Sequence, residues 1–138
     1  MKFTNWTAHN MWISFDSMLQ TFGQKKVSSV IIFGIMRNIR LLSTELTEFN
    51  EIKQKCLQKY KIDEAHKNDA DIEERIKKCN LELNTIGQEE IEVHLHQISY
   101  NFDQLQENLE NADVLISMQD IMFLQLICKR EHPDSNEK

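Results

Sequence analysis

The sequence predicts a mainly α-helical (α+β) protein: a long antiparallel helical hairpin, an N-terminal helix, a C-terminal helix and a small two- or three-stranded sheet. Two observations lead to this fold class. Gly (3) and Pro (1) are scarce among the 138 residues, whereas a β-sandwich or barrel needs frequent turn residues. Apolar residues also recur at helical spacing over most of the chain, and alternate with a period of two only after Gly87.

The N-terminal helix is expected to follow a short extended start at residues 1–4. Thr4 or Asn5 can cap it, because their side-chain oxygens accept a hydrogen bond from a free N–H group of the first turn. The helix should run to about Phe22, after which Gly23 stands where a helix end favours a left-handed residue. Its apolar side should consist of Trp6, Met11 or Trp12, Phe15, Met18, Leu19 and Phe22.

Two apolar stripes predict the long hairpin. The first starts after a cap at Ser28 or Ser29 and recurs every three or four residues, close to the 3.5-residue repeat of a coiled-coil seam. Its members are Ile35, Ile39, Leu42, Leu46, Phe49, Ile52, Cys56 and Tyr60. The second stripe has the same spacing and consists of Ile72, Ile76, Cys79, Leu83 and Ile86.

A polar loop separates the two stripes, so helices over roughly 29–61 and 70–86 should fold back on each other. With the turn near residues 67–68, facing positions sum to about 135. This register pairs Cys56 with Cys79, Ile52 with Leu83, and Phe49 with Ile86.

After Gly87 the two-residue alternation predicts a strand over about residues 91–97. A helix over about 100–109 and a second extended segment at 114–116 should follow. Ser117, with Asp120 three residues later, resembles a capping box and opens the last helix.

The predicted domain organisation is simple. The length suits one domain, which we expect to span residues 1–130. Residues 131–138 carry no apolar side chain and are predicted to form a disordered tail.

The net charge of −6 is distributed unevenly. Residues 81–128 contain no Lys or Arg but nine acidic residues, whereas residues 1–44 carry five cations and one acid. Such an acidic half repels nucleic acid and attracts basic surfaces. The residues expected to contact a protein partner are Glu89, Glu90, Glu92, Glu107 and Glu110.

One polar strand face could carry metal chemistry. Glu90, Glu92, His94 and His96 would point the same way on the predicted strand, and His94, His96 and Glu92 are the candidate ligands. The alternative is the solvated side of an amphipathic strand. Because the spacing matches no zinc motif, we predict no metal, no cofactor and no enzymatic activity.

The other candidate sites are also better explained as structural features than as catalytic or nucleic-acid-binding sites. Cys56 could be a nucleophile with His66 or His96 as base, but its place on a helical seam favours a packed thiol. Glycine is too scarce for a phosphate-binding loop. Trp6 and Trp12 fit a core, and the cations Lys25, Lys26, Arg37 and Arg40 form only a weak patch, so direct nucleic-acid binding is not expected.

The location and assembly of the chain can also be predicted. No apolar run is long enough to span a bilayer, and the N-terminus lacks the features of a signal peptide. Three cysteines without CxxC spacing indicate reduced thiols in the cytoplasm. The apolar residues Ile31, Ile32, Phe33 and Met36 exceed what one partner helix can cover, which suggests a homodimer or a bound partner.

Five segments of the chain resemble a family of small uncharacterised proteins encoded by phages and prophages of Gram-positive bacteria. They are MKFTN (1–5), KKVSSVIIFGIMRNIRLLSTEL (25–46), LQKYKIDE (57–64), EVHLHQIS (92–99) and ISMQDIMFLQLI (116–127). The best-matching positions are Lys26-Val27-Ser28, Arg37-Asn38 and Lys59-Tyr60. The chain departs from the family in lacking a proline before Lys25-Lys26 and in its Trp- and Met-rich start.

The resemblance implies the cytoplasm of an infected or lysogenic bacterium and provides no catalytic residues. Within this setting the acidic half favours an anti-CRISPR-like inhibitor, which would bind a host nucleic-acid-handling defence complex by protein–protein contact. The alternative is a phage structural or assembly accessory, such as a tail or baseplate chaperone. A metal-dependent enzyme on the Glu/His strand is the third interpretation.

Overall fold

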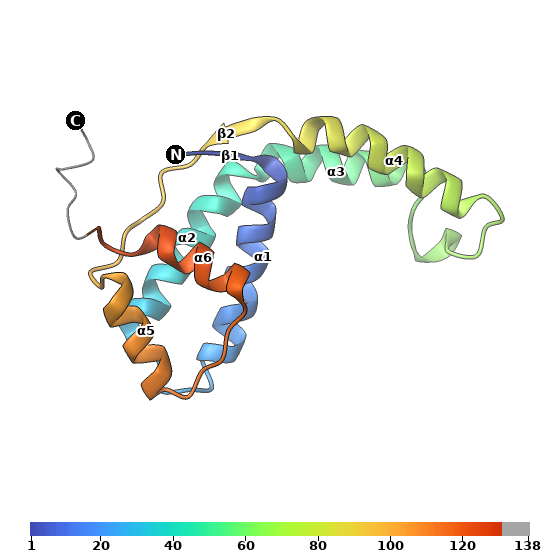
Figure 1. Cartoon of the computed structure of the whole chain (residues 1–138). Helices are drawn as coiled ribbons and strands as arrows, with labels where there is room; N and C mark the ends of the chain where they lie inside the picture. The colour runs from blue at the N-terminus through green and yellow to red at the C-terminus, as the bar shows by residue number, and fades with distance from the viewer. Residues whose placement is uncertain (131–138) are drawn as a thin grey trace.

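The computed structural model of the protein describes residues 1–130 (Figure 1). The predicted disordered tail, residues 131–138, lies outside the described residues. In chain order the elements are β1 (Lys2–Thr4), α1 (Asn5–Phe22), α2 (Ser29–Glu45), α3 (Thr47–Lys59), the 3-10 turn η1 (Glu64–His66), α4 (Ile72–Gly87), β2 (Glu90–Glu92), α5 (Phe102–Asn111) and α6 (Met118–Ile127). The predicted fold class, mainly helical with a small sheet, is confirmed.

The molecule has two parts. Helices α1, α2, α5 and α6 form what we call the body, and α3, the loop after it and α4 form an arm that projects from the body (Figure 1). The short sheet of β1 and β2 lies where the arm joins the body.

Side-chain caps define where most helices begin. Thr4 accepts a hydrogen bond from the Thr7 N–H at 3.1 Å, so α1 spans the predicted range. Ser28 caps α2 through the Val30 N–H. Met11, rather than Trp12, lies on the buried side of α1. The expected left-handed residue at Gly23 is wrong: its φ is −63°, because a right-handed turn continues the chain there.

The first apolar stripe is not one helix, which corrects the prediction of a helix over 29–61. The chain breaks at Leu46 (φ −91°, ψ 0°), a buried residue that ends α2 and precedes α3. The two halves of the stripe have different partners, since α2 packs on α1 and α3 packs on α4. The hairpin therefore consists of α3 and α4 alone.

The predicted hairpin register is confirmed. The sulfur atoms of Cys56 and Cys79 lie 3.1 Å apart across the seam. Ile52 and Leu83 line one cavity, and Phe49 and Ile86 line another. Farther along the arm the expected seam fails: Ile72 is only half-buried, Ile76 is 37% exposed, and neither belongs to the apolar cluster around the cysteines.

The sheet has two antiparallel strands, with Phe3 opposite Ile91. Strand β2 is shorter than the predicted 91–97, since only one more hydrogen bond, from the Val93 N–H to the Met1 carbonyl, extends the pairing. Residues 93–98 then run along α2 without a strand partner. The expected extended segment at 114–116 is not a strand either, and leads into α6, which Ser117 caps through the Asp120 N–H.

Buried Asn38 of α2 holds the segment after β2 in place. Its amide donates to the carbonyls of Gly34 (2.8 Å) and His96 (2.9 Å), and its oxygen accepts from the His96 N–H (2.8 Å). Gly34 allows the close approach, because a Cβ there would lie 2.1 Å from an Ile98 side-chain carbon. This packing fixes the route of the chain from the arm to α5.

Candidate protein-binding site

An apolar groove runs between α5 and the start of α6. Its volume is about 180 Å³. The lining residues are Phe102, Leu105, Gln106, Leu109, Glu110, Val114, Leu115, Ile116 and Ile121. Among the lining residues Leu115 is strongly exposed, and the exposed residues Met118 and Met122 follow it in the chain.

Helix α5 forms one wall of the groove because it is amphipathic. A capping box between Asn101 and Gln104 starts the helix, with both reciprocal hydrogen bonds present. Leu105 and Leu109 point into the body and are buried. The other side of α5 carries the exposed carboxylates Asp103, Glu107 and Glu110, spaced four and three residues apart.

Residues 114–116 and Ile121 of α6 form the other wall, and seven of the ten residues of α6 are apolar. Leu124 and Ile127 are buried in the body, and the Phe123 ring stacks edge-on with Phe15 of α1 at 6.5 Å. On another side of α6, Met118 and Met122 are 73% and 60% exposed among the described residues, and Leu115, in the segment before the helix, is 96% exposed.

The charged residues close to the groove in the sequence are acidic. The groove lies within residues 81–128, which have no Lys or Arg. Besides the three carboxylates on α5, Asp113 is exposed in the turn before α6, and Asp120 lies in the first turn of α6. Exposed apolar side chains flanked by acidic groups are typical of a surface that binds a partner with apolar and basic residues.

The structure divides the five predicted partner-binding residues into two groups. Glu110 of α5 lines the groove, and Glu107 lies three residues before it on the same helix, outside the lining. Glu89, Glu90 and Glu92 lie in or next to β2, at the far end of the body in Figure 1. One of this second group is paired: the N-terminal ammonium donates to Glu92 at 2.9 Å, and this hydrogen bond lowers the pKa of the Glu92 carboxyl.

The candidate metal ligands are not brought together. Glu92 binds the ammonium group, His94 is exposed, and the Nε2 atom of His96 lies 3.5 Å from the Arg37 guanidinium. A neighbouring guanidinium repels a metal cation. Within residues 1–130, no three His, Cys, Asp or Glu side chains gather in a group that could hold a metal ion.

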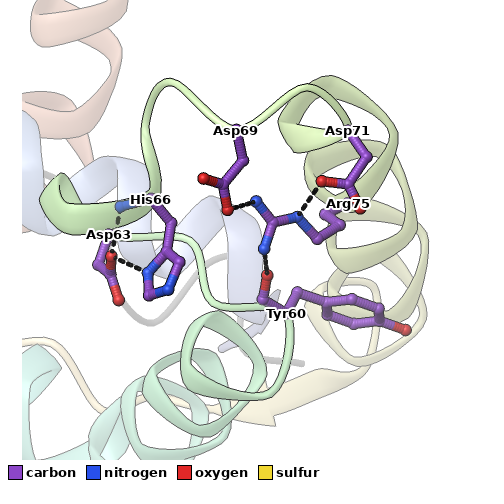
Figure 2. A network of polar contacts seen from close by, with 6 residues as sticks. All are labelled: Tyr60, Asp63, His66, Asp69, Asp71 and Arg75. Atoms are coloured by element: carbon purple, nitrogen blue, oxygen red, sulfur yellow. Dashed lines mark hydrogen bonds and ion pairs between the residues drawn. The ribbon is translucent and has the colours of Figure 1, made fainter.

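Cys56 lies in surroundings that keep its thiol neutral. Burial raises its pKa to about 12, with hydrogen bonds to Cys79 and Glu82 acting in the same direction. A nucleophilic cysteine needs the opposite shift. Both candidate bases are engaged elsewhere. The Nδ1 atom of His66 lies 2.6 Å from Asp63, a contact that lowers the pKa of the Asp63 carboxyl (Figure 2), and His96 lies beside Arg37.

A polar network orders the end of the arm (Figure 2). The Arg75 guanidinium donates to the Asp69 carboxylate at 2.7 Å and to the Tyr60 carbonyl at 3.2 Å. Its Nε atom lies 3.4 Å from Asp71, an ion-pair distance. These contacts close the loop between α3 and α4. We therefore interpret this network as structural.

Sequence reasoning placed the exposed apolar surface in the wrong segment. Ile31 is fully buried, and Ile32 and Met36 are half-buried, because α2 packs on α1 and under residues 93–98. Phe33 alone of that group is exposed. The exposed surface lies instead at α6. The composition of this helix was the available signal, since seven of its ten residues are apolar and such a helix has more apolar surface than one neighbour buries.

Comparison with protein-family models, curated proteins and solved structures gives no match for this chain. Among residues 1–130, none of the helices combines the length and the apolar character needed to cross a bilayer. The functional interpretation therefore rests on the groove and its surroundings.

Proposed function

We propose that the chain is a non-enzymatic binding protein whose α5–α6 groove contacts a basic surface of another protein. The observation that carries this proposal is the exposure of Leu115, Met118 and Met122 beside an apolar groove. Three large apolar side chains left in water on one small surface are unfavourable unless a partner covers them. Methionine also suits such a surface, because its flexible thioether adapts to different partners.

The surrounding charge selects the class of partner. Nucleic acid is a polyanion, and the carboxylates on α5 would repel it. A basic protein surface is attracted by them, and contacts of this kind mainly raise the association rate in a salt-dependent way. We assign this role to Glu110, which lines the groove, and to Glu107, three residues before it on α5.

The resemblance to phage and prophage proteins supplies the biological setting of the proposal. In that setting the protein acts in the bacterial cytoplasm as an inhibitor of a host defence complex, in the manner of an anti-CRISPR protein. Complexes that handle nucleic acid present basic grooves, and an acidic protein with apolar anchors can occupy such a groove. A role in virion assembly is the competing function.

Phage plating tests the proposal. A phage that carries the gene, and the same phage without it, are plated on matched hosts with and without a defence system. We expect the gene to raise plating on the defended host only, and a Met118→Ser, Met122→Ser variant to lose this gain. Equal plating on both hosts, with the protein recovered in virions or assembly intermediates, would favour the assembly function.

A further inference from the structure

A second cavity lies between α2 and the segment that follows β2. Its volume is about 560 Å³, within the range of about 300–1,000 Å³ that is typical of small-molecule sites. Four residues of α2, from Val30 to Arg37, line one wall, and residues 96–99 line the other. None of these residues lines the groove between α5 and α6, so the cavity is a separate site.

Buried contacts hold the two walls in place. Asn38, with no exposed surface, bonds to both backbone groups of His96, at 2.9 Å and 2.8 Å. Two residues later, the Ile98 N–H donates to the Ile127 carbonyl at 2.8 Å. The second wall is therefore fixed to the core although it is neither helix nor strand, and the cavity is formed before any ligand binds.

The wall on α2 carries a cation that has no carboxylate partner within residues 1–130. The contact that the structure gives the exposed Arg37 guanidinium is to the Nε2 atom of His96, at 3.5 Å, and this contact joins the two walls. A guanidinium has five N–H donors. Most of these donors therefore remain available to an anion that enters the cavity.

The chain segments that form the cavity contain no acidic residue. Residues 17–44 and 93–102 have no Asp or Glu, although the net charge of the chain is −6. Lys129 adds a cation nearby, since its backbone N–H donates to the Tyr100 carbonyl at 2.8 Å, one residue after Ser99. The charge of these segments favours an anionic ligand.

Phe33 gives the same cavity an aromatic surface. Its side chain is 62% exposed, and it lies four residues before Arg37, on the same face of α2. An exposed aromatic ring can stack on a planar group of a ligand, whichever base or ring that group is. The guanidinium beside it matches the geometry of a phosphate, which it can bind through two parallel hydrogen bonds.

We propose that this cavity binds a small anionic ligand in which a planar ring is joined to a phosphate group, as in a nucleoside monophosphate. The phosphate lies between Arg37 and His96, within reach of the Ser99 hydroxyl, and the ring stacks on Phe33. A longer nucleic acid is not expected, because the acidic half of the chain repels further phosphates. The site goes beyond the proposed function and does not depend on it.

The direct test measures the binding of adenosine monophosphate to the full chain by calorimetry. Adenosine, which lacks the phosphate, and inorganic phosphate, which lacks the ring, are the controls. We expect one nucleotide to bind per chain, about tenfold or more tighter than either control, because each control makes only part of the contacts. Absence of saturable binding up to about 10 mM nucleotide would overturn the inference.

Two charge-neutralising variants locate the phosphate. Arg37→Gln should weaken nucleotide binding about tenfold or more, because it removes the guanidinium. Arg40→Gln makes the same change of charge at an exposed position of α2 outside the cavity, and it should weaken binding less than about twofold. Equal losses in the two variants would overturn the inference, because they would show a general charge effect.

A second pair of variants locates the ring. Phe33→Ala should weaken nucleotide binding about tenfold or more and leave the binding of inorganic phosphate unchanged. Leu41→Ala removes an exposed apolar side chain of α2 outside the cavity, and it should weaken binding less than about twofold. All the substituted side chains are exposed, so circular dichroism should show native helix content. Equal effects of Phe33→Ala and Leu41→Ala would contradict the stacking and overturn the inference.

Nuclear magnetic resonance of the unsubstituted chain places the ligand directly. Adenosine monophosphate should shift the imidazole signals of His96 and the ring signals of Phe33, but not the imidazole signals of His94, which is exposed outside the cavity. Shifts at His94 without shifts at His96 would overturn the inference. A single-stranded oligonucleotide that bound more than about tenfold tighter than the mononucleotide would also overturn it, because the site would then belong to an extended nucleic-acid surface.

Discussion

The body and the arm are held together by different interactions. The apolar core of the body is continuous across its four helices and includes Met11, Phe15, Ile35, Leu42 and Leu124, each with no exposed surface. The arm has its own small cluster, in which Cys56, Cys79 and Leu83 are the buried members. Two helices share only one seam, and each keeps an outer face in water. A two-helix arm therefore buries little apolar surface, and its stability depends more on polar contacts.

These polar contacts are distributed along the arm. Near its middle, Glu82 of α4 accepts hydrogen bonds from Lys59 (2.9 Å) and Tyr60 (2.6 Å) of the facing helix end. At its far end, the Arg75 network closes the loop (Figure 2). Exposed ion pairs contribute little individually, so we expect the stability of the arm to fall from its base to its tip.

The base of the arm is fixed by Trp6, which packs against both apolar clusters. Its ring meets Phe49 of α3 edge-on at 5.2 Å. Gly87 of α4 makes room for the indole, because a Cβ there would lie 2.0 Å from the Trp6 Nε1 atom. Asn5 adds a hydrogen bond to the Ile86 carbonyl at 2.9 Å. The start of the chain thus joins the two parts.

The largest effect should come from a cavity in the body. Phe15→Ala should lower the free energy of unfolding by about 3–5 kcal/mol, because the ring is fully buried and its loss leaves a void. Leu83→Ala, the matched change in the arm, should lower it by about 2 kcal/mol, since the thin arm can relax around the gap. Urea unfolding measures both values.

Single-tryptophan variants sharpen this test, because the two indoles report on different parts. Trp6 lies at the base of the arm, whereas Trp12 donates to Ser43 between α1 and α2. Leu83→Ala should shift the Trp6 transition more than the Trp12 transition. If each substitution shifts the Trp6 and Trp12 transitions by the same amount, the body and the arm unfold as one unit.

A smaller effect, confined to the arm, should follow oxidation of Cys56 and Cys79. A small-molecule disulfide should convert them to an intramolecular disulfide by two exchange steps that release two small thiols. The crosslink should stabilise the arm by about 3 kcal/mol through loop closure. Thiol counting and peptide mapping detect the bond, and Cys128, whose buried sulfur donates to the Leu124 carbonyl, should stay a thiol.

The rate of this oxidation should depend steeply on pH. The thiolate is the attacking species, and the pKa of Cys56 is raised to about 12. When Cys56 attacks, the rate should therefore rise about tenfold per pH unit below that value. Cys79→Ser is the control. A rate independent of pH, or crosslinking of Cys128 in place of Cys79, would contradict the geometry of the seam.

Local signals explain why much of the fold was predictable. The caps at Thr4, Ser28 and Ser117 depend on a hydrogen bond two or three residues away, so the sequence itself contains both partners. The pairing of Cys56 with Cys79 depends on a short loop and two stripes of one period. In each case the deciding contact is close in sequence or is fixed by counting from a turn.

The break at Leu46 was not predictable in the same way. No Gly or Pro marks it, and the apolar spacing continues through it, because both halves of the stripe are buried, against different partners. The prediction of a strand over 91–97 was wrong for a related reason. Ile91, Val93 and Leu95 do turn inward, but past Val93 they pack without a paired strand, so the alternation reported burial rather than hydrogen bonding.

The candidate site was predicted only in part. The acidic composition suggested a basic partner, and one of the five named carboxylates, Glu110, lines the groove. The sequence did not indicate which apolar residues remain uncovered. Met118 and Leu124 belong to the same apolar helix, yet one is exposed and the other buried, and only the positions of α1 and α5 decide between them.

Asn38 should contribute less than a core aromatic but more than any surface contact. Asn38→Ala removes both hydrogen bonds to the His96 backbone and should lower the free energy of unfolding by about 2 kcal/mol. Hydrogen exchange should locate the loss, with faster exchange of the His96 amide. Asn50→Ala, at an exposed position of α3, should change stability by less than about 0.5 kcal/mol. If Asn38→Ala changes the stability equally little, water replaces the hydrogen bonds that the Asn38 side chain makes.

The smallest effect should be the acid sensitivity of the arm. The hydrogen bonds from Tyr60 and Lys59 lower the pKa of Glu82 to about 2, from its usual value near 4.5. A lowered pKa stabilises the folded arm above the usual value, and this contribution is lost as the pH falls from about 5 towards 2. Trp6 fluorescence in urea at several pH values should show this loss. Glu82→Gln should remove it, whereas Glu74→Gln, which breaks the exposed pair with Lys78 on the same helix, should leave it unchanged. The same acid dependence in Glu82→Gln as in the unsubstituted chain would mean that other carboxylates control the arm, and that the Glu82 contacts are no stronger than ordinary surface pairs.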